Sequence, residues 1–378
     1  MPISLPRTIR LLERGIAEGL HFGAQLYISL RASDGGPRVS IALGERAPGE
    51  PMDEGTPNIW LSSTKPVTAV ALGVLWQEGM LRLDDTVAHF VPEFAAHGKD
   101  QITLRHLLTH TAGIRMLNLG WPEATWDEII AGICARKPEP RWPIGKKAGY
   151  HLASSWFILG EVIARVAGRP FPEFVRERVL EPCGMDGTWI GMPQPQFDEI
   201  RDHLGRMYGT ENGQRIERRW HEASSVVGSS PGGNGRGPIR ELGLFYEMLL
   251  NGGVTRSGQH VLTPQTVAAM TTPHRVGLFD HTFKQKLDWG LGFIVDSKHY
   301  GESSVAYGYG PYASRRTFGH SGYRSSTGFA DPEHDLVVAL LVNGQPSDAE
   351  HGRRFDGLTG AIYQDLGLAP EVPSSEDD

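Results

Sequence analysis

The sequence predicts an α+β protein in which a lobe built on a β-sheet is interrupted by a mostly helical insertion. Strand patterns occur near both ends of the chain, helical patterns separate them, and a helix is expected at each terminus. With 378 residues, of which 39% are hydrophobic and 21% charged, the chain can bury the core of a two-lobed globular protein. We therefore assign residues 1–86 and 235–378 to the sheet lobe and residues 87–234 to the helical lobe.

The elements of the sheet lobe follow from apolar periodicity. Apolar residues at helical spacing predict a first helix over Thr8–Leu20, and apolar runs bounded by turn residues predict the strands. The expected strands are Gln25–Arg31, Val39–Leu43, Trp289–Val295, Ser325–Ala330 and Asp335–Val342. Two further helices are expected over Ile239–Leu250, which Asn251-Gly252-Gly253 ends, and over Phe355–Leu366.

The insertion consists mainly of helices joined by long loops. Its clearest helices are Leu104–His110, Trp126–Arg136, Ser155–Val166 and Pro172–Leu180. The Gly/Pro-rich segment Ser229–Pro238 marks the return to the sheet lobe.

Charge and cysteine content argue against several classes of function. The net charge of −7 and the lack of a dense Lys/Arg cluster argue against a nucleic-acid partner. Cys134 and Cys183 allow at most one disulfide and lack metal-binding spacing, and Cys183 is expected to be a packing residue. The first residues show no signal peptide and no run is apolar enough to span a membrane, so we expect a cytoplasmic protein without a membrane partner. The oligomeric state stays open.

A serine and a lysine stand at the start of a predicted helix. Ser62 precedes Lys65 by three residues, and apolar residues recur at helical spacing after Pro66. Because proline is tolerated only in the first turn of a helix, this helix must begin near Ser62. Residues three apart share a helix face, so the Ser62 hydroxyl can meet the Lys65 amine, and free N–H groups of the helix start face any anion that forms there. The arrangement indicates an activated nucleophile, although a serine at a helix start is more often only a cap.

Two other stretches offer partners for this pair. Tyr150 ends a loop that contains proline and glycine, directly before the predicted helix at Ser155, and His320 lies in the stretch Phe318–Tyr323, which precedes the predicted strand Ser325–Ala330. A tyrosine in this position could move protons, and a histidine with a neighbouring backbone N–H could stand beside a nucleophile. Taken singly, the tyrosine is as readily explained by packing and the histidine by a turn.

In their order along the chain, these motifs resemble the serine β-lactamase and penicillin-binding-protein superfamily, and within it the class C-like, esterase-type branch. Ser62-Ser63-Thr64-Lys65 is similar to the Ser-x-x-Lys motif, Tyr150-His151 is similar to the tyrosine motif, and His320-Ser321-Gly322 stands where β-lactam-active relatives carry Lys-Thr-Gly. Further segments that match the family pattern are His106–Ile114, Leu180–Met185 and Gly232-Gly233. The resemblance implies a β-lactamase/transpeptidase-like fold, with an antiparallel sheet flanked by the terminal helices and the active site between the two lobes.

The resemblance also implies roles for individual residues. The implied catalytic residues are Ser62, Lys65, Tyr150 and His320, and the backbone N–H groups of Ser62 and Tyr323 would form the oxyanion hole. The expected substrate-binding residues are Leu152, Ser321 and Gly322 beside these motifs, and Trp121 and Trp126 of the insertion. The loop Tyr300–Tyr312 is expected to form a further pocket wall, although the aromatic residues are equally explained by packing between the lobes. Neither a cofactor nor a metal is implied.

Two departures from the family pattern concern the substrate. The usual Asn two residues after the tyrosine is Leu152 here, and the Lys of Lys-Thr-Gly is His320; both changes weaken recognition of a β-lactam's amide and carboxylate. We therefore expect a serine hydrolase that forms an acyl-enzyme on Ser62, and specifically a carboxylesterase acting on small-molecule esters. The alternatives are an acyltransferase, a D-amino-peptidase or amide hydrolase of the same fold, and a degenerate ligand-binding protein.

Two other motifs receive a structural interpretation. Gly228-Ser229-Ser230-Pro231-Gly232 matches the Gly-x-Ser-x-Gly pattern of α/β-hydrolases, but Pro231 and the glycines after it cannot propagate the helix that this motif requires. Ser229 is therefore expected to be a loop serine. His106 and His110 lie four residues apart, yet no Glu lies between them and no third ligand is apparent, so both are interpreted as structural.

Overall fold

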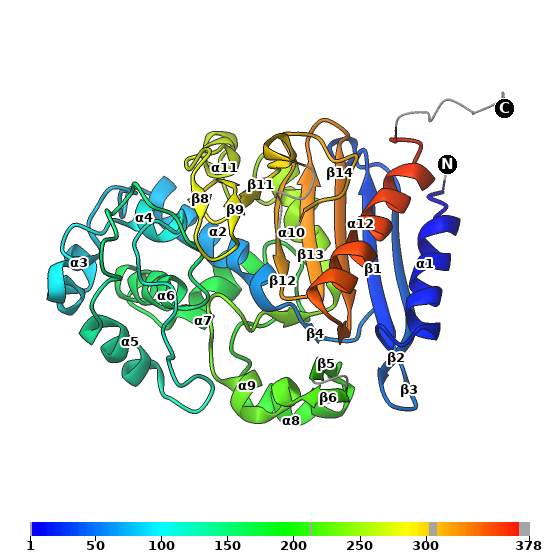
Figure 1. Cartoon of the computed structure of the whole chain (residues 1–378), viewed down its shortest axis with the longest axis horizontal. Helices are drawn as coiled ribbons and strands as arrows, with labels where there is room; N and C mark the ends of the chain where they lie inside the picture. The colour runs from blue at the N-terminus through cyan, green and yellow to red at the C-terminus, as the bar shows by residue number, and fades with distance from the viewer. Residues whose placement is uncertain (1, 212–213, 302–307, 370–378) are drawn as a thin grey trace.

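The computed structural model of the chain describes residues 2–211, 214–301 and 308–369. Its centre is one eight-stranded sheet in which every neighbouring pair is antiparallel, with helices on both faces (Figure 1). In order across the sheet, the strands are β10 (Asp288–Trp289), β11 (Ile294–Val295), β12 (Phe318–Gly322), β13 (Ser326–Asp331), β14 (Leu336–Val342), β1 (Gly23–Leu30), β2 (Arg38–Ala47) and β3 (Glu50–Pro51). The prediction of an α+β fold with an antiparallel sheet is confirmed.

Strand β14 shows why both faces of the sheet are covered. Because successive residues of a strand point to opposite faces, its seven apolar residues divide between two cores. Val337, Ala339 and Leu341 face a core that includes α10 (Ile239–Leu250) and α2 (Lys65–Gln77). The alternate residues face α1 (Pro6–Ala17) and α12 (Asp348–Asp365), the two terminal helices that lie side by side in Figure 1.

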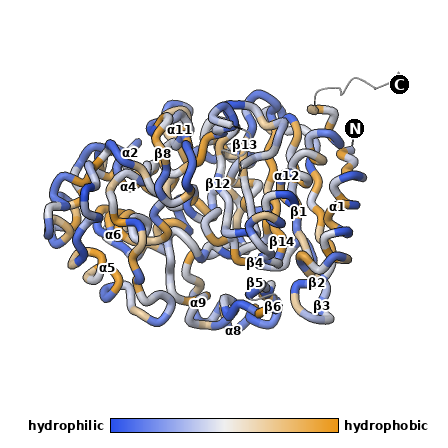
Figure 2. The backbone as a smooth tube through the Cα atoms, viewed as in Figure 1, coloured by the Kyte–Doolittle hydropathy of each residue, from blue (hydrophilic) through white to orange (hydrophobic). Residues whose placement is uncertain are grey.

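The terminal helices cover the sheet with one face each. Along α1, hydrophilic and hydrophobic stretches alternate in Figure 2, as expected of a helix that buries only one side. Leu12 of α1 is fully buried, whereas Arg14 and Glu18 form an exposed ion pair. The first helix begins two residues before the predicted Thr8 and ends three residues before Leu20.

Helix α2 connects the sheet to the helical part of the chain. All of its residues from Lys65 to Leu75 are buried, because it contacts β12 on one side and α6 and α7 on the other. The helices not yet named are α3 (Val87–Phe90), α4 (Leu104–Leu108), α5 (Trp126–Ala135), α6 (Ser154–Ala167), α7 (Phe171–Val175), α8 (Gln194–Ile200), α9 (Ala223–Val227) and α11 (Pro264–Thr271). In the parts of the chain that the structure describes, no helix combines the length and the apolar character needed to cross a membrane.

Several short strands lie outside the main sheet. A pair is formed by β4 (Asn58–Ile59) with β7 (Arg236–Gly237), and another by β8 (Phe279–Asp280) with β9 (Gln285–Lys286). A small third sheet contains β5 (Met207–Glu211), β6 (Gln214–Arg218) and β15 (Gly344–Gln345). None of these strands is expected from the sequence, and the β5–β6 hairpin lies in the stretch interpreted as mostly helical. The assignment of residues 87–234 to a separate lobe stays a prediction.

Two predicted elements are corrected by the structure. The single strand expected over Trp289–Val295 is wrong: β10 and β11 are antiparallel to each other and are joined by a turn. Gly292 in that turn has φ +85°, and a Cβ there would lie 2.5 Å from Ala69 Cβ of α2, so only glycine fits. The helix expected over Pro172–Leu180 is α7 followed by one π-helical turn from Arg176 to Leu180.

Candidate active site

Ser62 lies in a 3₁₀ turn, Leu61–Thr64, that leads directly into α2. Its side chain is partly exposed, whereas Ser63 beside it is buried and donates from Oγ to the His320 carbonyl at 3.2 Å. Leu61 has φ 52°, a left-handed conformation that is uncommon for a residue with a Cβ and that is often found at functional sites. The predicted helix start near Ser62 is confirmed, and the turn is fixed against β12.

Lys65 is fully buried with its amine directed at Ser62. Its Nζ lies 3.0 Å from Ser62 Oγ, 3.0 Å from the Leu152 carbonyl and 2.7 Å from the Gly232 carbonyl. Burial lowers the pKa of the amine well below its ordinary value, and among the described residues no carboxylate forms an ion pair with it. The spacing argument that brings the serine and the lysine together is therefore confirmed.

Tyr150 is buried beside the same amine. Lys65 Nζ lies 5.1 Å from the centre of the Tyr150 ring, and the centres of the Tyr150 and His320 rings lie 5.9 Å apart. The Tyr150 ring also contacts the rings of His110 and Phe283, each at 4.8 Å between centres. The structure thus brings together the four side chains for which the resemblance implies catalytic roles.

His320 is a neutral histidine in the middle of β12. Burial and the nearby Lys65 amine lower its pKa to about 3. Its Nδ1 lies 2.9 Å from the Ser321 carbonyl, which can only accept a hydrogen bond, so Nδ1 carries the hydrogen and Nε2 carries the lone pair. At neutral pH the imidazole is therefore uncharged and can accept a hydrogen bond at Nε2.

The end of β12 approaches the turn that holds Ser62. Pairing between β11 and β12 ends at Gly319, so residues 320–322 extend beyond β11. A Cβ on Gly322 would lie 2.2 Å from the Trp60 carbonyl, and glycine therefore permits this close approach. Ser321 is buried and donates to Thr327 Oγ1 at 2.9 Å, whereas Tyr323, in the turn after β12, is 45% exposed.

His110 supports the tyrosine loop. It is fully buried, and its Nδ1 accepts a hydrogen bond from the His151 N–H at 2.9 Å. His106 belongs to the N-terminal cap of α4, where its Nδ1 accepts from the Thr103 N–H at 3.1 Å. Both histidines thus have structural contacts, as interpreted from the sequence, and within residues 2–211, 214–301 and 308–369 no group of three His, Cys, Asp or Glu could hold a metal.

The two predicted pocket tryptophans line one pocket together. Trp121, Trp126 and Ser229 line an apolar pocket of about 400 Å³, whose lining includes none of the four candidate catalytic residues. The Trp126 indole donates to Glu161 Oε2 at 2.6 Å. Leu152, whose side chain is 51% exposed, is the predicted pocket residue that lies beside Lys65. Residues 302–307 of the predicted pocket wall Tyr300–Tyr312 lie outside the described residues.

Ser229 occupies a loop, as predicted. Its hydroxyl donates to the Ile190 carbonyl at 3.4 Å, and no helix starts directly after it. Both cysteines are free and buried, and burial raises the pKa of Cys134 to about 11 and that of Cys183 to about 12. Neither thiol is therefore a nucleophile at neutral pH.

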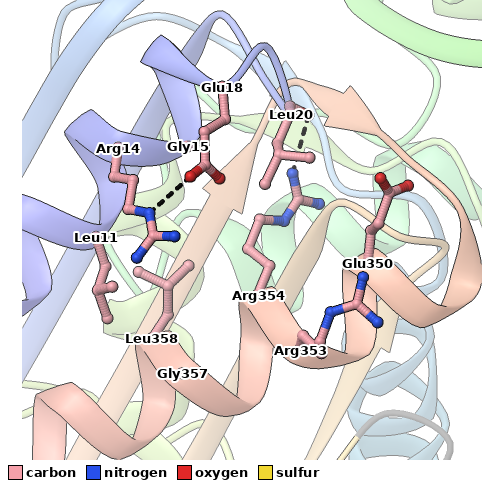
Figure 3. A pocket seen from close by; sticks show the side chains of 10 residues that line it. All are labelled: Leu11, Arg14, Gly15, Glu18, Leu20, Glu350, Arg353, Arg354, Gly357 and Leu358. Carbon is pink, nitrogen blue, oxygen red and sulfur yellow. Dashed lines mark hydrogen bonds and ion pairs between the residues drawn. The ribbon is translucent and has the colours of Figure 1, made fainter.

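A more polar pocket of about 360 Å³ lies between α1 and α12, away from these residues. Figure 3 shows that charged side chains of both helices surround it. Within it, Arg14 pairs with Glu18 at 2.6 Å and Arg354 donates to the Leu20 carbonyl at 3.1 Å. Among the described residues, those that line this pocket include no Ser, Thr, Cys, Lys, Tyr or His, so it offers none of the side chains that the expected serine chemistry requires.

Sequence reasoning missed the residues that hold Tyr150 in place. The Tyr150 N–H donates to Asp280 Oδ1 at 3.1 Å, and the Tyr150 carbonyl accepts from Thr282 Oγ1 at 3.0 Å. Both partners belong to the β8–β9 hairpin, which is 130 residues away in the chain. This segment carries no recognisable motif, and only the fold reveals its position.

Comparison with known proteins identifies the family to which the chain belongs. The family described as Beta-lactamase matches residues 22–361 of the chain. The chain belongs to the β-lactamase family. This β-lactamase-family protein is 26% identical to the "Esterase/beta-lactamase LipL" of Mycobacterium tuberculosis (strain ATCC 25618 / H37Rv) over 336 residues, which cover 82% of this chain and 75% of the relative. It is 27% identical over 348 residues to "Esterase EstB" of Burkholderia gladioli, covering 86% of this chain and 84% of the relative.

A solved structure extends this similarity to three dimensions. The "family VIII carboxylesterase" structure superposes with a TM-score of 0.78 at 25% identity and covers 97% of this chain and 99% of its own. The resemblance inferred from the motifs is confirmed, and the β-lactamase-family protein is a hydrolase of this fold.

Proposed function

We propose that this β-lactamase-family hydrolase is a carboxylesterase that acts on small-molecule esters through an acyl-enzyme on Ser62. The observation that carries the proposal is the set of partners around Lys65 Nζ. Two of them, the carbonyls of Leu152 and Gly232, can only accept hydrogen bonds, and the third is the Ser62 hydroxyl. A neutral amine has two hydrogens for the carbonyls and one lone pair for the hydroxyl proton, so this arrangement suits a general base.

Burial supports the same protonation state. It lowers the pKa of Lys65 well below its ordinary value, and a neutral amine is what proton abstraction from Ser62 requires. The partly exposed Ser62 hydroxyl at the edge of a buried helix is accessible to a substrate carbonyl.

In the acylation step, the proton of Ser62 passes through Lys65 and Tyr150 to the leaving alcohol. Ser62 Oγ bonds to the carbonyl carbon while its proton moves to Lys65 Nζ, and the backbone N–H groups of Ser62 and Tyr323 receive the oxyanion. The ester C–O bond breaks, and the alcohol leaves with the proton, which Lys65 passes on through Tyr150. The neutral His320 either accepts a hydrogen bond at Nε2 from the Tyr150 hydroxyl or helps to position the acyl-enzyme.

Deacylation repeats these steps with water. Water attacks the acyl carbon, loses a proton to the Lys65–Tyr150 pair, and displaces Ser62 Oγ, which recovers its proton. An alcohol or amine in place of water would make the protein an acyltransferase.

The nature of the substrate is supported by the residues at two positions. His320 and Leu152 offer no permanent positive charge and no side-chain amide to bind a β-lactam. Of the two relatives, EstB is named an esterase, and LipL is named an esterase/beta-lactamase. Leu152 is half-exposed and apolar, which suits an apolar ester group.

The test is a panel of esters, amides, D-amino peptides and β-lactams assayed with purified protein, together with mass analysis of the acylated peptide. We expect turnover of simple esters and an acyl group on the Ser62 peptide. Faster turnover of amides or D-amino peptides would replace the esterase by an amide hydrolase, and binding without turnover of any class would replace the enzyme by a ligand-binding protein.

A further inference from the structure

The β8–β9 hairpin holds the main chain of Tyr150 from both sides. Asp280 is fully buried, and its Oδ1 accepts hydrogen bonds from three backbone N–H groups: those of Tyr150 at 3.1 Å, Thr282 at 2.9 Å and Phe283 at 3.0 Å. The Thr282 hydroxyl donates to the Tyr150 carbonyl at 3.0 Å. Both backbone polar groups of Tyr150 thus end on side chains of one hairpin.

The other oxygen of Asp280 ties this contact to the rest of the site. Asp280 Oδ2 forms an ion pair with Arg275 Nη2 at 3.1 Å, and both side chains are buried. Arg275 Nη1 donates to the Thr109 carbonyl at 3.1 Å. The next residue, His110, accepts from the backbone N–H of His151, which follows Tyr150. The contacts therefore form a closed circuit, which runs from Tyr150 through Asp280, Arg275, Thr109 and His110 to His151 and back along the chain to Tyr150. The backbone of Tyr150 and His151 is fixed by groups that are bonded to one another.

The ring of Tyr150 is fixed by the same hairpin. Phe283 packs against it at 4.8 Å between ring centres, on a segment whose N–H is also bound to Asp280. Arg115 extends the support, since its Nη1 donates to Thr282 Oγ1 at 3.1 Å. A shift of Asp280 would therefore move the backbone of Tyr150 and the aromatic ring packed against it.

We infer that Asp280, Arg275 and Thr282 are positioning residues. They hold the Tyr150 hydroxyl within reach of Lys65 and the leaving group. This inference rests on the proposed function, because Tyr150 needs a fixed position only if it transfers protons. The three residues do not touch the reacting atoms; they act through Tyr150 alone. A displacement of about 1 Å in a catalytic group can cost about a hundredfold in rate.

The test compares Asp280→Ala and Thr282→Val with a matched control. Thr282→Val keeps the shape of the side chain and removes the hydroxyl that donates to the Tyr150 carbonyl, so it tests the hairpin's second contact with Tyr150 even if Asp280→Ala fails to fold. The control is Glu247→Gln, which alters a buried carboxylate that pairs with Arg38 and accepts from the Tyr27 hydroxyl, neither of which is a candidate catalytic or positioning residue. Circular dichroism and thermal melting select the folded variants. The readouts are kcat and KM for an ester, and the rate at which a serine-reactive phosphonate labels Ser62.

We expect Asp280→Ala to lower kcat about 10–100-fold and Thr282→Val about 3–10-fold, each with little change in KM, because the position of Tyr150 changes and the binding of the ester does not. Glu247→Gln should keep the wild-type kcat. Adding Tyr150→Phe to either variant should cost no more than Tyr150→Phe alone, since a positioning residue has nothing left to position.

Wild-type kcat in folded Asp280→Ala or Thr282→Val would overturn the inference. A double variant whose loss equals the product of the two single losses would overturn it too, because the effects would then be independent. If the wild-type protein hydrolyses no ester, the proposed function is contradicted and not the positioning role. The rates at which the phosphonate labels Ser62 then still allow the variants to be compared with Glu247→Gln.

Discussion

Lys65 and His320 are both fully buried, and burial lowers the pKa of each, but the two residues suit different tasks. Lys65 shares its hydrogen bonds between two carbonyls and the Ser62 hydroxyl, so its lone pair faces the proton to be removed. His320 holds its Nδ1 hydrogen on the Ser321 carbonyl and presents a lone pair at Nε2. Tyr150 lies near both, with its ring centre 5.1 Å from Lys65 Nζ and 5.9 Å from the centre of the His320 ring, and we propose that a proton leaves the pair through its hydroxyl.

Removing Lys65 or Tyr150 should disable the same step. Lys65→Met keeps the length of the side chain without the amine, and Tyr150→Phe keeps the ring without the hydroxyl. Each change should lower kcat about 10²–10⁴-fold, because it removes general acid–base assistance. The double variant should lose far less than the product of the two losses, since the groups act as a unit. A folded Tyr150→Phe protein with near-normal kcat would make Tyr150 a packing residue.

The pH dependence of kcat/KM should report Lys65 and not His320. The base must be neutral, so the rate falls about tenfold per pH unit once the pH is below the pKa of Lys65. Because burial lowers that pKa, the plateau should begin well below pH 10.5, the ordinary value for a lysine. The pKa of His320 is about 3, so this imidazole stays neutral from pH 5 upwards. In His320→Gln the acidic limb of the profile should keep its position; a limb that shifts or disappears would identify His320 as the base.

The residues at positions 320 and 152 should favour esters over β-lactams. Where β-lactam-active relatives carry Lys, the neutral His320 cannot form a charge-assisted hydrogen bond to a carboxylate. Such a bond is worth about 1.5–3 kcal/mol, or one to two orders of magnitude in rate. Steady-state kinetics should therefore give a kcat/KM for simple esters at least about tenfold above that for penicillins and cephalosporins. Equal efficiency on the two substrate classes would contradict this reading of His320 and Leu152.

At the scale of elements, α12 shows how a cap sets the start of a helix. Ser347 accepts from the Glu350 N–H at 3.3 Å, and the Glu350 carboxylate accepts from the Ser347 N–H at 3.0 Å, a reciprocal capping box. Ser347→Ala should destabilise the protein by about 0.5–2 kcal/mol, because the Glu350 N–H loses its acceptor and the Glu350 carboxylate loses the hydrogen bond from the Ser347 hydroxyl. The midpoint of urea unfolding should fall while the slope and kcat stay unchanged. An unchanged midpoint would mean that water replaces the cap at no cost.

The same helix shows what the sequence can predict and what it cannot. The apolar period predicts Phe355–Leu366 and misses the polar first turns, because the residues from Asp348 onwards form a helix through a cap and not through burial of apolar residues. Where an apolar face extends to both ends, as in Ile239–Leu250, the prediction matches the structure to the residue. The strand over Trp289–Val295 is predicted from its run of apolar residues. This run does not show that Gly292 allows the chain to reverse between β10 and β11.

The candidate site divides in the same way. Ser62 and Lys65 are predictable because three residues of helix bring them together, whatever the rest of the fold does. Asp280 and Thr282 were not predictable, because their contact with Tyr150 depends on a hairpin more than a hundred residues away. Trp121 and Trp126 illustrate the converse: aromatic residues of the insertion, expected to line the substrate pocket, line a pocket that does not include Ser62.

At the scale of the whole molecule, the site exists because one buried helix joins three distant segments. Helix α2 packs against β12 of the sheet on one side and against α6 on the other, and α6 follows the Tyr150 loop. The first residue of α2 is Lys65, so the amine lies where the segments of Ser62, Tyr150 and His320 meet. The chain order of these segments is also what makes the family recognisable from the sequence.

The central claim is that Ser62 is the nucleophile, and labelling by a serine-reactive phosphonate tests it most directly. Ser229 provides the matched control, because it is the serine of the competing Gly-x-Ser-x-Gly motif and lies in a loop without a lysine partner among the described residues. Mass analysis of the labelled wild-type protein should find the phosphonate on the Ser62 peptide. Ser62→Ala should abolish both labelling and ester turnover, and Ser229→Ala should preserve both. Label on Ser229, or full activity in Ser62→Ala, would contradict the account.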